Sequence, residues 1–376
     1  MLKLENMTEE KEAKDHGRRE LDKQSISGEV NNMAKQKKNT IQSHLRLIQK
    51  LQSIGPLEIT DLNAFLVQAK IDFEYLFKDK TIFDFRISDF KIIRKLGRGG
   101  FGNVVLAKMK SDDDDGILYA IKAIDKKTVI KQKIFASVYN EKRVLQSLNF
   151  PFVVYLKYFF VDYHYLYFVM PFVPGGDFSE YLATQTVLSE PHARFYVSQL
   201  ILALEYLHYL GLIHRDVKPE NIMIDAFGYI KLADFGLCTR CYGNDRAWTM
   251  AGTPFYMAPE IIMLKGYDCS VDWWALGILL YVICSGDFPF RNDSTIKTYE
   301  LIISCRYEVP TTFSKNLKQL LKRLLVLKPE MRIANSKKGA NEIKSHNWLE
   351  STDWLKILNR TIEAPYIPDI SGQESG

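Results

Sequence analysis

The stretch IHRDVKPEN, residues 213–221, lies near the middle of this 376-residue chain and follows a helical pattern that ends at Leu210-Gly211. Asp234-Phe235-Gly236 comes thirteen residues after Asn221, and Ala258-Pro259-Glu260 comes 22 residues after Gly236. One such short motif can match by chance, but three in this order and at these gaps do not. Residues 213–260 therefore carry one combined motif, and the segments on either side of it indicate the fold that surrounds it.

The chain on the N-terminal side of this stretch has the pattern of a sheet. Short runs rich in β-branched and aromatic residues occur at 90–97, 103–109, 118–124, 156–161 and 165–173, with one helical segment near 132–148. After Gly175-Gly176 the pattern becomes helical and includes a twelve-residue apolar run, Trp273 to Cys284, which is too short to span a bilayer. We expect an α+β fold: a small antiparallel β-rich lobe with one helix, and a larger helical lobe.

Glycines precede the second expected strand in the pattern Gly97-x-Gly99-x-x-Gly102-x-Val104. The pattern leads into a strand and not into a helix, which argues against the strand–turn–helix of a dinucleotide-binding dehydrogenase. Because glycine has no side chain, such a loop lets backbone amides approach phosphates closely. A simple hairpin turn is the alternative.

Lys122 stands in the third expected strand, where alternation places it on one face with Ala120 and Ile124. A lysine in so apolar a strand is costly unless its charge is paired. Glu141, in the following helical segment, can supply the partner. An ion pair on the surface is the alternative interpretation.

The glycine loop, Lys122 and the motifs at 214–221, 234–236 and 258–260 together form the signature set of protein kinases, and the chain is identified as a member of that family. Residues 140–154, 188–200, 248–262, 266–277 and 363–370 further resemble the AGC group, and within it the catalytic subunits of cyclic-AMP-dependent kinases. The likeness covers about residues 60–370. It implies a bilobal kinase fold and transfer of the γ-phosphoryl group of Mg-ATP to Ser and Thr hydroxyls of proteins.

This resemblance also implies cyclic-AMP-type signalling with a relaxed preference for basic residues upstream of the acceptor. A catalytically weak, pseudokinase-like scaffold or regulator that binds nucleotide is the alternative. The implied catalytic residues are Asp216, Lys218, Lys122, Glu141, Asn221 and Asp234. Asn221 and Asp234 would hold Mg²⁺, which prefers hard oxygen ligands. The implied ATP-binding residues are Leu96, Gly97, Gly99, Gly102, Val104, Ala120, Lys122, Met170, Pro171, Val173 and Met223.

Substrate selection and regulation are assigned by the same resemblance. The implied substrate-binding residues are Asp177, Glu220, Met250, Thr253, Pro254 and Met257. Thr249 matches the regulatory phosphosite, with Arg215 as the partner of its phosphate. Thr239 and Ser137 replace two cationic residues of the relatives, so we expect Thr249 phosphorylation to be coupled less strongly to activity. Arg246 and Trp248 match positions that contact a cyclic-AMP-binding regulatory subunit.

The expected organisation has four parts. Residues 1–59 form a mostly disordered extension with a short helical pattern, because residues 1–40 carry 17 charged residues and no aromatic one. Residues 60–80 form a docked helix that begins near Thr60-Asp61. Residues 90–348 form the kinase domain, with an N-lobe at 90–172 and a C-lobe at 173–348. Residues 349–376 form a short tail without the hydrophobic motif of the relatives.

Composition limits the partners and the compartment. A net charge of +5 is too mild to favour nucleic acid, and the chain has neither an apolar span nor a glycine after Met1 for myristoylation, so we expect no membrane anchor. Five cysteines without framework spacing favour a reducing compartment, hence the cytoplasm, with the nucleus as a further location. Cys238-x-x-Cys241 is interpreted as two incidental loop cysteines, with a metal or redox site as the alternative.

Overall fold

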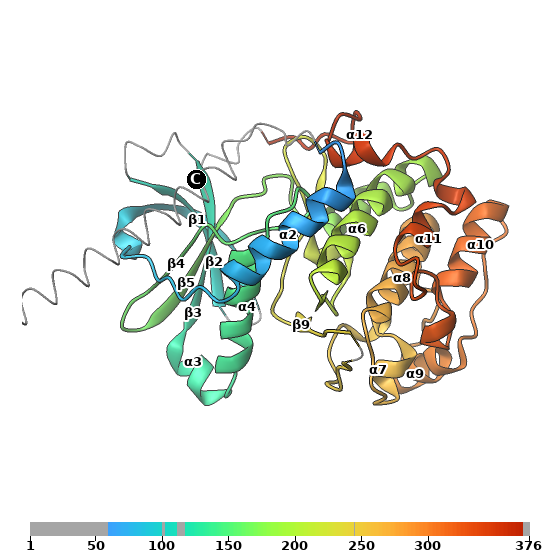
Figure 1. Ribbon diagram of the computed structural model, residues 1–376, viewed down its shortest axis with the longest axis horizontal. Helices are drawn as coiled ribbons and strands as arrows, with labels where there is room; N and C mark the ends of the chain where they lie inside the picture. The colour runs from blue at the N-terminus through green and yellow to red at the C-terminus, as the bar shows by residue number, and fades with distance from the viewer. Residues whose placement is uncertain (1–58, 100–101, 111–116, 244, 371–376) are drawn as a thin grey trace, which may run out of the picture. The chain divides into compact units, whose positions relative to one another are not determined.

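The computed structural model describes residues 59–99, 102–110, 117–243 and 245–370. The prediction of an extension at 1–59 therefore falls outside the described residues, except for Ile59. The described chain has a sheet-containing lobe and a helical lobe side by side (Figure 1). The predicted two-lobed α+β fold is confirmed.

The N-terminal lobe is built on one antiparallel sheet. Its strands are β1 (Phe90–Gly99), β2 (Gly102–Met109), β3 (Leu118–Asp125), β4 (Tyr158–Val161) and β5 (Tyr165–Pro171), in the order β1-β2-β3-β5-β4. One face of the sheet buries Tyr119 and Ile121 of β3 against Phe90 and Phe160. Alternation along β3 turns Ala120 and Lys122 to the opposite face.

The prediction of a single helix in this lobe is wrong, because two helices follow β3. They are α3 (Lys126–Lys131) and α4 (Phe135–Ser147). Asp125 caps α3 by accepting a hydrogen bond from the backbone N–H of Lys127, and this cap starts a helix directly at the end of the strand. Lys133 has φ +56°, which interrupts the helical backbone and separates α3 from α4.

The C-terminal lobe is mainly helical. Its helices are α5 (Phe178–Gln185), α6 (Glu190–Tyr209), α7 (Pro259–Ile262), α8 (Ser270–Ser285), α9 (Thr295–Ser304), α10 (Lys315–Leu324), α11 (Asn341–Lys344) and α12 (Trp354–Leu358). Short 3₁₀ turns occupy Ile87–Asp89, Pro219–Asn221, Pro254–Tyr256, Pro329–Met331 and Asn347–Leu349. Two small antiparallel pairs join β6 (Leu212–Ile213) to β9 (Thr239–Arg240) and β7 (Ile222–Ile224) to β8 (Ile230–Leu232).

The apolar run at 273–284 forms the buried helix α8 at the centre of this lobe. Trp273 and Trp274 are fully buried, and the side chains of α6 and α10 pack against α8. No helix among the described residues is both long and apolar enough to cross a membrane. The run is therefore core material of the lobe.

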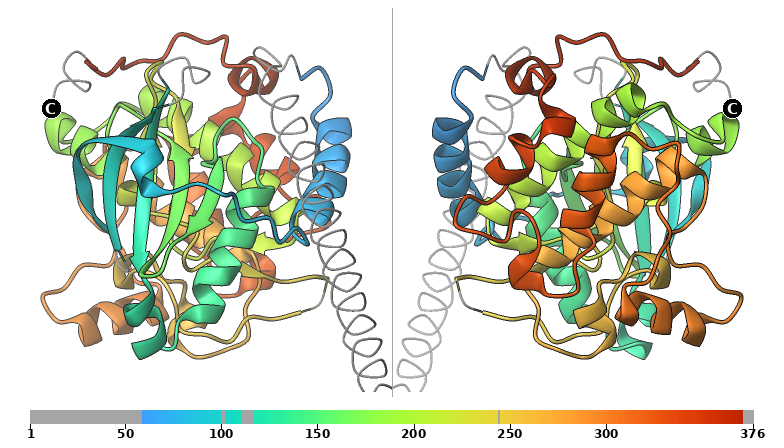
Figure 2. Two further views of the ribbon diagram at one scale, coloured as in Figure 1. Left: turned by 90° about the vertical axis from the view of Figure 1, so that its left-hand side faces the viewer. Right: turned by 90° about the vertical axis from the view of Figure 1, so that its right-hand side faces the viewer.

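Helix α2 (Leu62–Leu76) precedes the sheet and lies across both lobes. The side chain of Asp61 caps it by accepting hydrogen bonds from the N–H groups of Asn63 and Ala64. Figure 1 shows α2 running from the neighbourhood of α6 to α4, and both views of Figure 2 place it on the outside of the body. Phe73 in its last turn is fully buried, so the helix is packed firmly and not merely adjacent.

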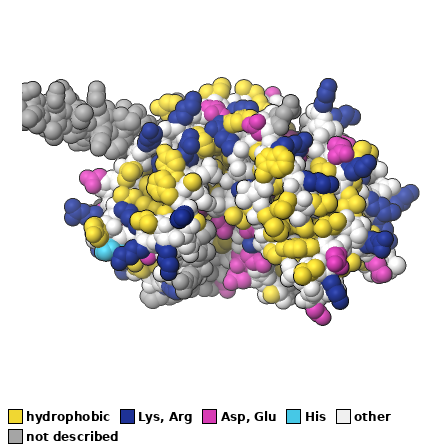
Figure 3. All heavy atoms as spheres, turned by 90° about the horizontal axis from the view of Figure 1, so that it is seen from below, with side chains coloured by type: hydrophobic (Ala, Val, Ile, Leu, Met, Phe, Trp, Pro, Cys, Tyr) yellow, Lys and Arg dark blue, Asp and Glu magenta, His cyan; other side chains and the backbone are white. Residues whose placement is uncertain are grey.

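The surface drawn in Figure 3 mixes hydrophobic, basic and acidic side chains, with a group of acidic side chains near the centre of that face. A mixed surface of this kind is ordinary for a folded domain. Among the described residues of this one face, basic and acidic side chains are interspersed.

Candidate active site

A cavity of about 590 Å³ lies between the two lobes and gathers most of the predicted nucleotide-binding residues. Its walls include Leu96, Gly97, Val104, Ala120, Met170, Pro171, Val173 and Met223, together with Lys122, Glu141, Asn221 and Asp234. Apolar side chains of both lobes therefore line the same cavity as the charged side chains of Lys122, Glu141 and Asp234. This combination suits a flat heterocycle that carries an anionic tail.

Gly97 and Gly102 of the loop differ in what surrounds them. A Cβ atom at Gly97 would meet no described atom within 4 Å, so the cavity is open there to a close ligand approach. A Cβ atom at Gly102 would lie 2.1 Å from the carbonyl oxygen of Ala123, so this glycine allows β2 to approach β3. Gly102 is not among the described residues that line the cavity.

Some lining residues were not predicted from the sequence. Phe172, Pro174, Glu180 and Arg94 also line the cavity. Glu180 is exposed and stands one helical turn after Asp177, which caps α5 by accepting hydrogen bonds from the N–H groups of Ser179 and Glu180. The carboxylate of Asp177 is thus already engaged locally, and its spacing before a helical run could have indicated a cap.

Lys122 and Glu141 form a buried ion pair across the sheet and α4, with Nζ to Oε1 at 2.6 Å. The side chains are 11% and 3% exposed, so the alternative of a surface ion pair does not hold. Burial by itself would lower the pKa of Lys122, but the charges of Glu141 and Asp234 raise it overall. The ammonium group is therefore kept charged inside the cavity.

Asp216 is surrounded by hydrogen-bond donors. Its carboxylate accepts from Thr253 Oγ1 at 2.6 Å and from Asn221 Nδ2 at 2.8 Å, and Lys218 Nζ lies 2.8 Å away. Lys218 Nζ also donates to Thr253 Oγ1 at 2.7 Å. Burial alone would raise the pKa of Asp216, but the hydrogen bonds from Lys218 and Thr253 lower it overall. The carboxylate is therefore ionised at neutral pH and can accept a further hydrogen bond.

The loop that carries Asp216 is anchored to α8 by hydrogen bonds to the fully buried carboxylate of Asp272. Its carboxylate accepts from the backbone N–H groups of His214 and Arg215, at 2.9 and 2.8 Å, and contacts the ring of His208 at 2.8 Å. Arg215 has φ +70°, a strained conformation for a side chain of this size. The two hydrogen bonds to Asp272 hold the loop in that conformation.

Asp234 stands opposite this loop in the same cavity. It too has a positive φ, +57°, and its Oδ1 accepts from the backbone N–H of Gly236 at 3.2 Å. Phe235 is fully buried, with its ring edge-on to His214 at 5.1 Å. Asn221 donates through Nδ2 to the backbone carbonyl and to the carboxylate of Asp216. Its amide oxygen is therefore the atom of this side chain that could bind a metal ion. The oxygens of Asn221 and Asp234 are suitable ligands for Mg²⁺.

The predicted substrate-side residues surround Asp216 unevenly. Glu220 is exposed and lines the cavity, whereas Met257 is buried beneath the loop at 249–254. Met250 is 47% exposed, and Pro254 begins a 3₁₀ turn that continues the chain away from Thr253. Thr253 alone of this group touches the carboxylate of Asp216.

Thr249 lies at a second cavity, of about 550 Å³, with Ser137, Asn140 and Thr239. Arg215 is the only Lys or Arg among the described residues that line it. The guanidinium of Arg215 already donates to the carbonyl of Leu237 at 2.6 Å and to Tyr267 Oη at 3.0 Å. The cavity therefore offers few positive charges to a phosphate.

Cys238 and Cys241 are both free cysteines in the structure. Cys238 is buried, and its burial raises the pKa of the thiol. Within the described ranges, no group of three or more His, Cys, Asp or Glu residues is placed to hold an ion.

Comparison with known proteins agrees with this geometry. A family model described as the protein kinase domain matches residues 90–349. The chain is 41% identical over 317 residues to cAMP-dependent protein kinase catalytic subunit 2 of Drosophila melanogaster, which covers 84% of this chain and 88% of that protein. It is 36% identical over 329 residues to cAMP-dependent protein kinase type 3 of Saccharomyces cerevisiae, covering 86% and 81%. It is 39% identical over 288 residues to cAMP-dependent protein kinase catalytic subunit PRKX of Homo sapiens, covering 77% and 79%.

Proposed function

Since the chain belongs to the protein kinase family and is a serine/threonine kinase, we propose that the cavity between its lobes binds Mg-ATP and that the enzyme phosphorylates proteins in cyclic-AMP-type signalling. The observation that carries the proposal is the position of Asp216. Its ionised carboxylate lies between Lys218, Thr253 and Asn221 at the cavity that also holds the buried Lys122–Glu141 pair. A scaffold without activity would not need these groups together.

The nucleotide would lie with its base in the apolar slot and its phosphates toward Lys122. The ammonium group of Lys122, fixed by Glu141, would offset the charge of the α- and β-phosphates. Asn221 and Asp234 would hold Mg²⁺, with the remaining ligands coming from phosphate and water, as this ion commonly has in proteins. Bound Mg²⁺ would supply charge neutralisation between the phosphates.

The protein's own part in phosphoryl transfer is positioning and electrostatics. Asp216 would accept a hydrogen bond from the substrate hydroxyl and orient its oxygen toward the γ-phosphorus. Lys218, which bridges Asp216 and Thr253, would offset the charge on the transferring group. Glu220, exposed at the cavity, would favour a basic residue before the acceptor, and the exposed part of Met250 a hydrophobic residue after it.

Thr249 is proposed as a phosphorylation site that tunes activity. A phosphate there would meet Arg215, whose donors already serve Leu237 and Tyr267. We expect weak coupling because Arg215 is the only Lys or Arg among the described residues that line this cavity, which also include Thr239 and Ser137.

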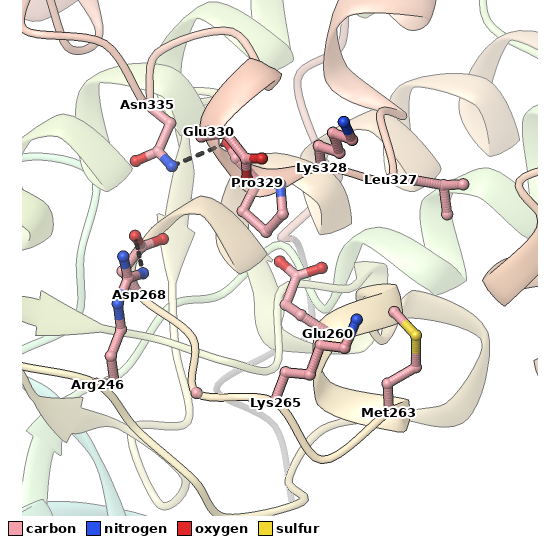
Figure 4. A pocket seen from close by; sticks show the side chains of 11 residues that line it. Arg246, Glu260, Met263, Lys265, Asp268, Leu327, Lys328, Pro329, Glu330 and Asn335 are labelled. Atoms are coloured by element: carbon pink, nitrogen blue, oxygen red, sulfur yellow. Dashed lines mark hydrogen bonds and ion pairs between the residues drawn. The ribbon is translucent and has the colours of Figure 1, made fainter.

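The surface around Arg246 and Trp248, next to Thr249, suits a protein partner. We propose that this partner is a cyclic-AMP-binding regulatory subunit. Trp248 is 68% exposed and its ring lies against Gly266, which lines a cavity of about 460 Å³. Figure 4 shows Arg246 joined to Asp268 on one side of this cavity, with Lys265 and Met263 on another. An exposed tryptophan beside an arginine is the composition of a binding hot spot.

The proposed function is tested by transfer of labelled phosphate from Mg-ATP to a peptide of the Arg-Arg-x-Ser-hydrophobic kind. We expect transfer by the unchanged protein, loss of transfer in Asp216→Ala, and weaker binding of the arginine peptide in Glu220→Gln. Mg-ATP binding without transfer to any peptide would reject the catalytic proposal. Titration with a cyclic-AMP-binding regulatory subunit should inhibit transfer, and Trp248→Ala should relieve that inhibition.

The location proposed for the protein is the cytoplasm, with the nucleus as a further site. Microscopy of the tagged full-length chain tests this. Exclusive localisation to a secretory compartment would contradict it.

A further inference from the structure

The last turn of α2 makes an ionic contact with the segment that follows the Asp234-Phe235-Gly236 motif. Residues 234–260 are called the activation segment below. Glu74 of α2 pairs with the guanidinium of Arg240 in β9 and accepts a hydrogen bond from Tyr242 Oη at 2.5 Å. One carboxylate thus holds two side chains of the activation segment. Glu74 lies outside the kinase sequence motifs.

The same turn of α2 also holds α4, the helix that carries Glu141. The ring of Phe77 lies between two guanidinium groups, with the central carbon of Arg143 at 3.8 Å from its centre and that of Arg240 at 4.3 Å. Arg143 Nε donates to the carbonyl of Phe77 at 2.9 Å, and Gln146 Nε2 donates to that of Leu76 at 2.6 Å. The end of α2 is therefore fixed to the N-terminal lobe as well.

Arg240 and Tyr242 contact the strand and turn that lead into the loop that carries Asp216. Arg240 pairs with Leu212 in the β9–β6 ladder, and β6 ends one residue before His214. The ring of Tyr242 lies so close to Gly211 that a Cβ atom there would be 2.9 Å from it. A shift of Arg240 away from α2 would therefore strain the backbone that leads to Asp216.

We propose that Glu74 is a positioning residue for phosphoryl transfer. Its carboxylate keeps β9 against α2, and through β6 it keeps the Asp216 loop in its working geometry, whether or not Thr249 carries phosphate. The shortage of cations around Thr249 is what gives this contact its importance, since Arg215 alone among the described lining residues can attract a phosphate there. The inference rests on the kinase activity of the site and adds to it a residue outside the cavity.

The kinetic test uses Glu74→Gln, which keeps the size of the side chain and removes its charge. Glu74 is 35% exposed, and water weakens an ion pair that is partly exposed, so we expect only a moderate effect. The expected result is a fall in kcat of about three- to tenfold, with KM for Mg-ATP unchanged. Tyr242→Phe, which removes one hydrogen bond and keeps the ring beside Arg240, should lower kcat less. Asp72→Asn is the matched control, because the carboxylate of Asp72 accepts a hydrogen bond from Gln68 of the same helix.

Two further readouts separate positioning from a loss of folding. Trypsin should cut the activation segment of Glu74→Gln faster at Arg240 and Arg246, while its unfolding midpoint stays with that of the Asp72→Asn control. In a Thr249→Ala background, the fall in kcat caused by Glu74→Gln should be at least as large as in the unchanged protein.

Three results would overturn the proposal: an unchanged kcat, an unchanged rate of trypsin cleavage, or an effect that disappears in Thr249→Ala. A fall in kcat accompanied by an equal loss of folded protein would also overturn it, because the role would then be purely structural. If the unchanged protein transfers no phosphate, the proposed function fails, but the trypsin experiment still decides whether Glu74 holds the segment.

Discussion

The buried pair between Glu260 and Arg332 allows a quantitative prediction about what holds the C-terminal lobe together. Arg332 donates to both carboxylate oxygens of Glu260, at 2.7 and 3.1 Å, and to the carbonyls of Ser270 and Val326, at 2.7 and 2.9 Å. The two charged side chains are 0% and 3% exposed. In Glu260→Gln the guanidinium keeps its carbonyl partners but loses its counter-charge where water cannot replace it.

Breaking a buried pair from one side costs about 3–5 kcal/mol of unfolding free energy. Because 1.4 kcal/mol is a factor of ten, this raises the unfolding equilibrium constant by about a hundred- to several-thousand-fold. Urea unfolding followed by tryptophan fluorescence measures the change, since Trp274 is fully buried and Arg332 lies 5.3 Å from its ring centre. The urea midpoint should fall with the slope m unchanged.

Two controls make the prediction specific. Arg291→Gln breaks the exposed pair with Asp287, and its urea midpoint should stay close to that of the unchanged protein. The double variant Glu260→Leu with Arg332→Met should be more stable than Glu260→Gln, because it leaves no unpaired buried charge. If Glu260→Gln unfolds within about 1 kcal/mol of the unchanged protein, our account of this pair as a dry, compensated charge is refuted.

Three further predictions concern activity and pH. Thr253→Val removes a hydrogen bond that lowers the pKa of Asp216, so kcat should fall roughly ten- to a hundredfold and the acidic limb of its pH profile should move to higher pH; an unmoved limb would contradict this. Thr249→Ala should keep kcat within about fivefold, because one cation lines its cavity in the described residues; an inactive variant would show strong coupling. Burial lowers the pKa of Lys142 to about 8, so folded protein loses this proton before unfolded chain does. Stability should therefore gain from this group between about pH 8 and 10.5, and Lys142→Met should reduce that gain in urea titrations; an unchanged pH slope would count against it.

The location of the chemistry could be predicted from the sequence because the side chains that carry it occur in short, ordered motifs. The residues from His214 to Asn221 and from Asp234 to Gly236 lie on loops whose geometry is set by their immediate neighbours. The strands were also predictable, since their alternation and β-branched composition are local properties. These signals need no knowledge of which segments meet in space.

Local pattern failed where a cap or a turn decided the outcome. Helix α3 was missed because Asp125 starts a six-residue helix, which is too short to show a periodic apolar face. Asp177 matches a substrate-binding position and lines the cavity, and its carboxylate also caps α5, which a motif comparison does not show. In both cases an aspartate carboxylate accepts hydrogen bonds from backbone N–H groups, which the local pattern did not reveal.

The sequence by itself determined the fold class, the catalytic motifs and the family, because each depends on residue types at fixed spacings. Only the tertiary structure decided which charges are paired and how deeply they are buried. The sequence allowed the Lys122–Glu141 ion pair to be either buried or on the surface. Packing of α4 on the sheet makes it a buried pair. The contact of Glu74 with Arg240 joins residues 166 positions apart, and no local pattern encodes it. Long-range contacts of this kind arise only when packing brings α2 beside β9, and they set the energy of each charge through its surroundings.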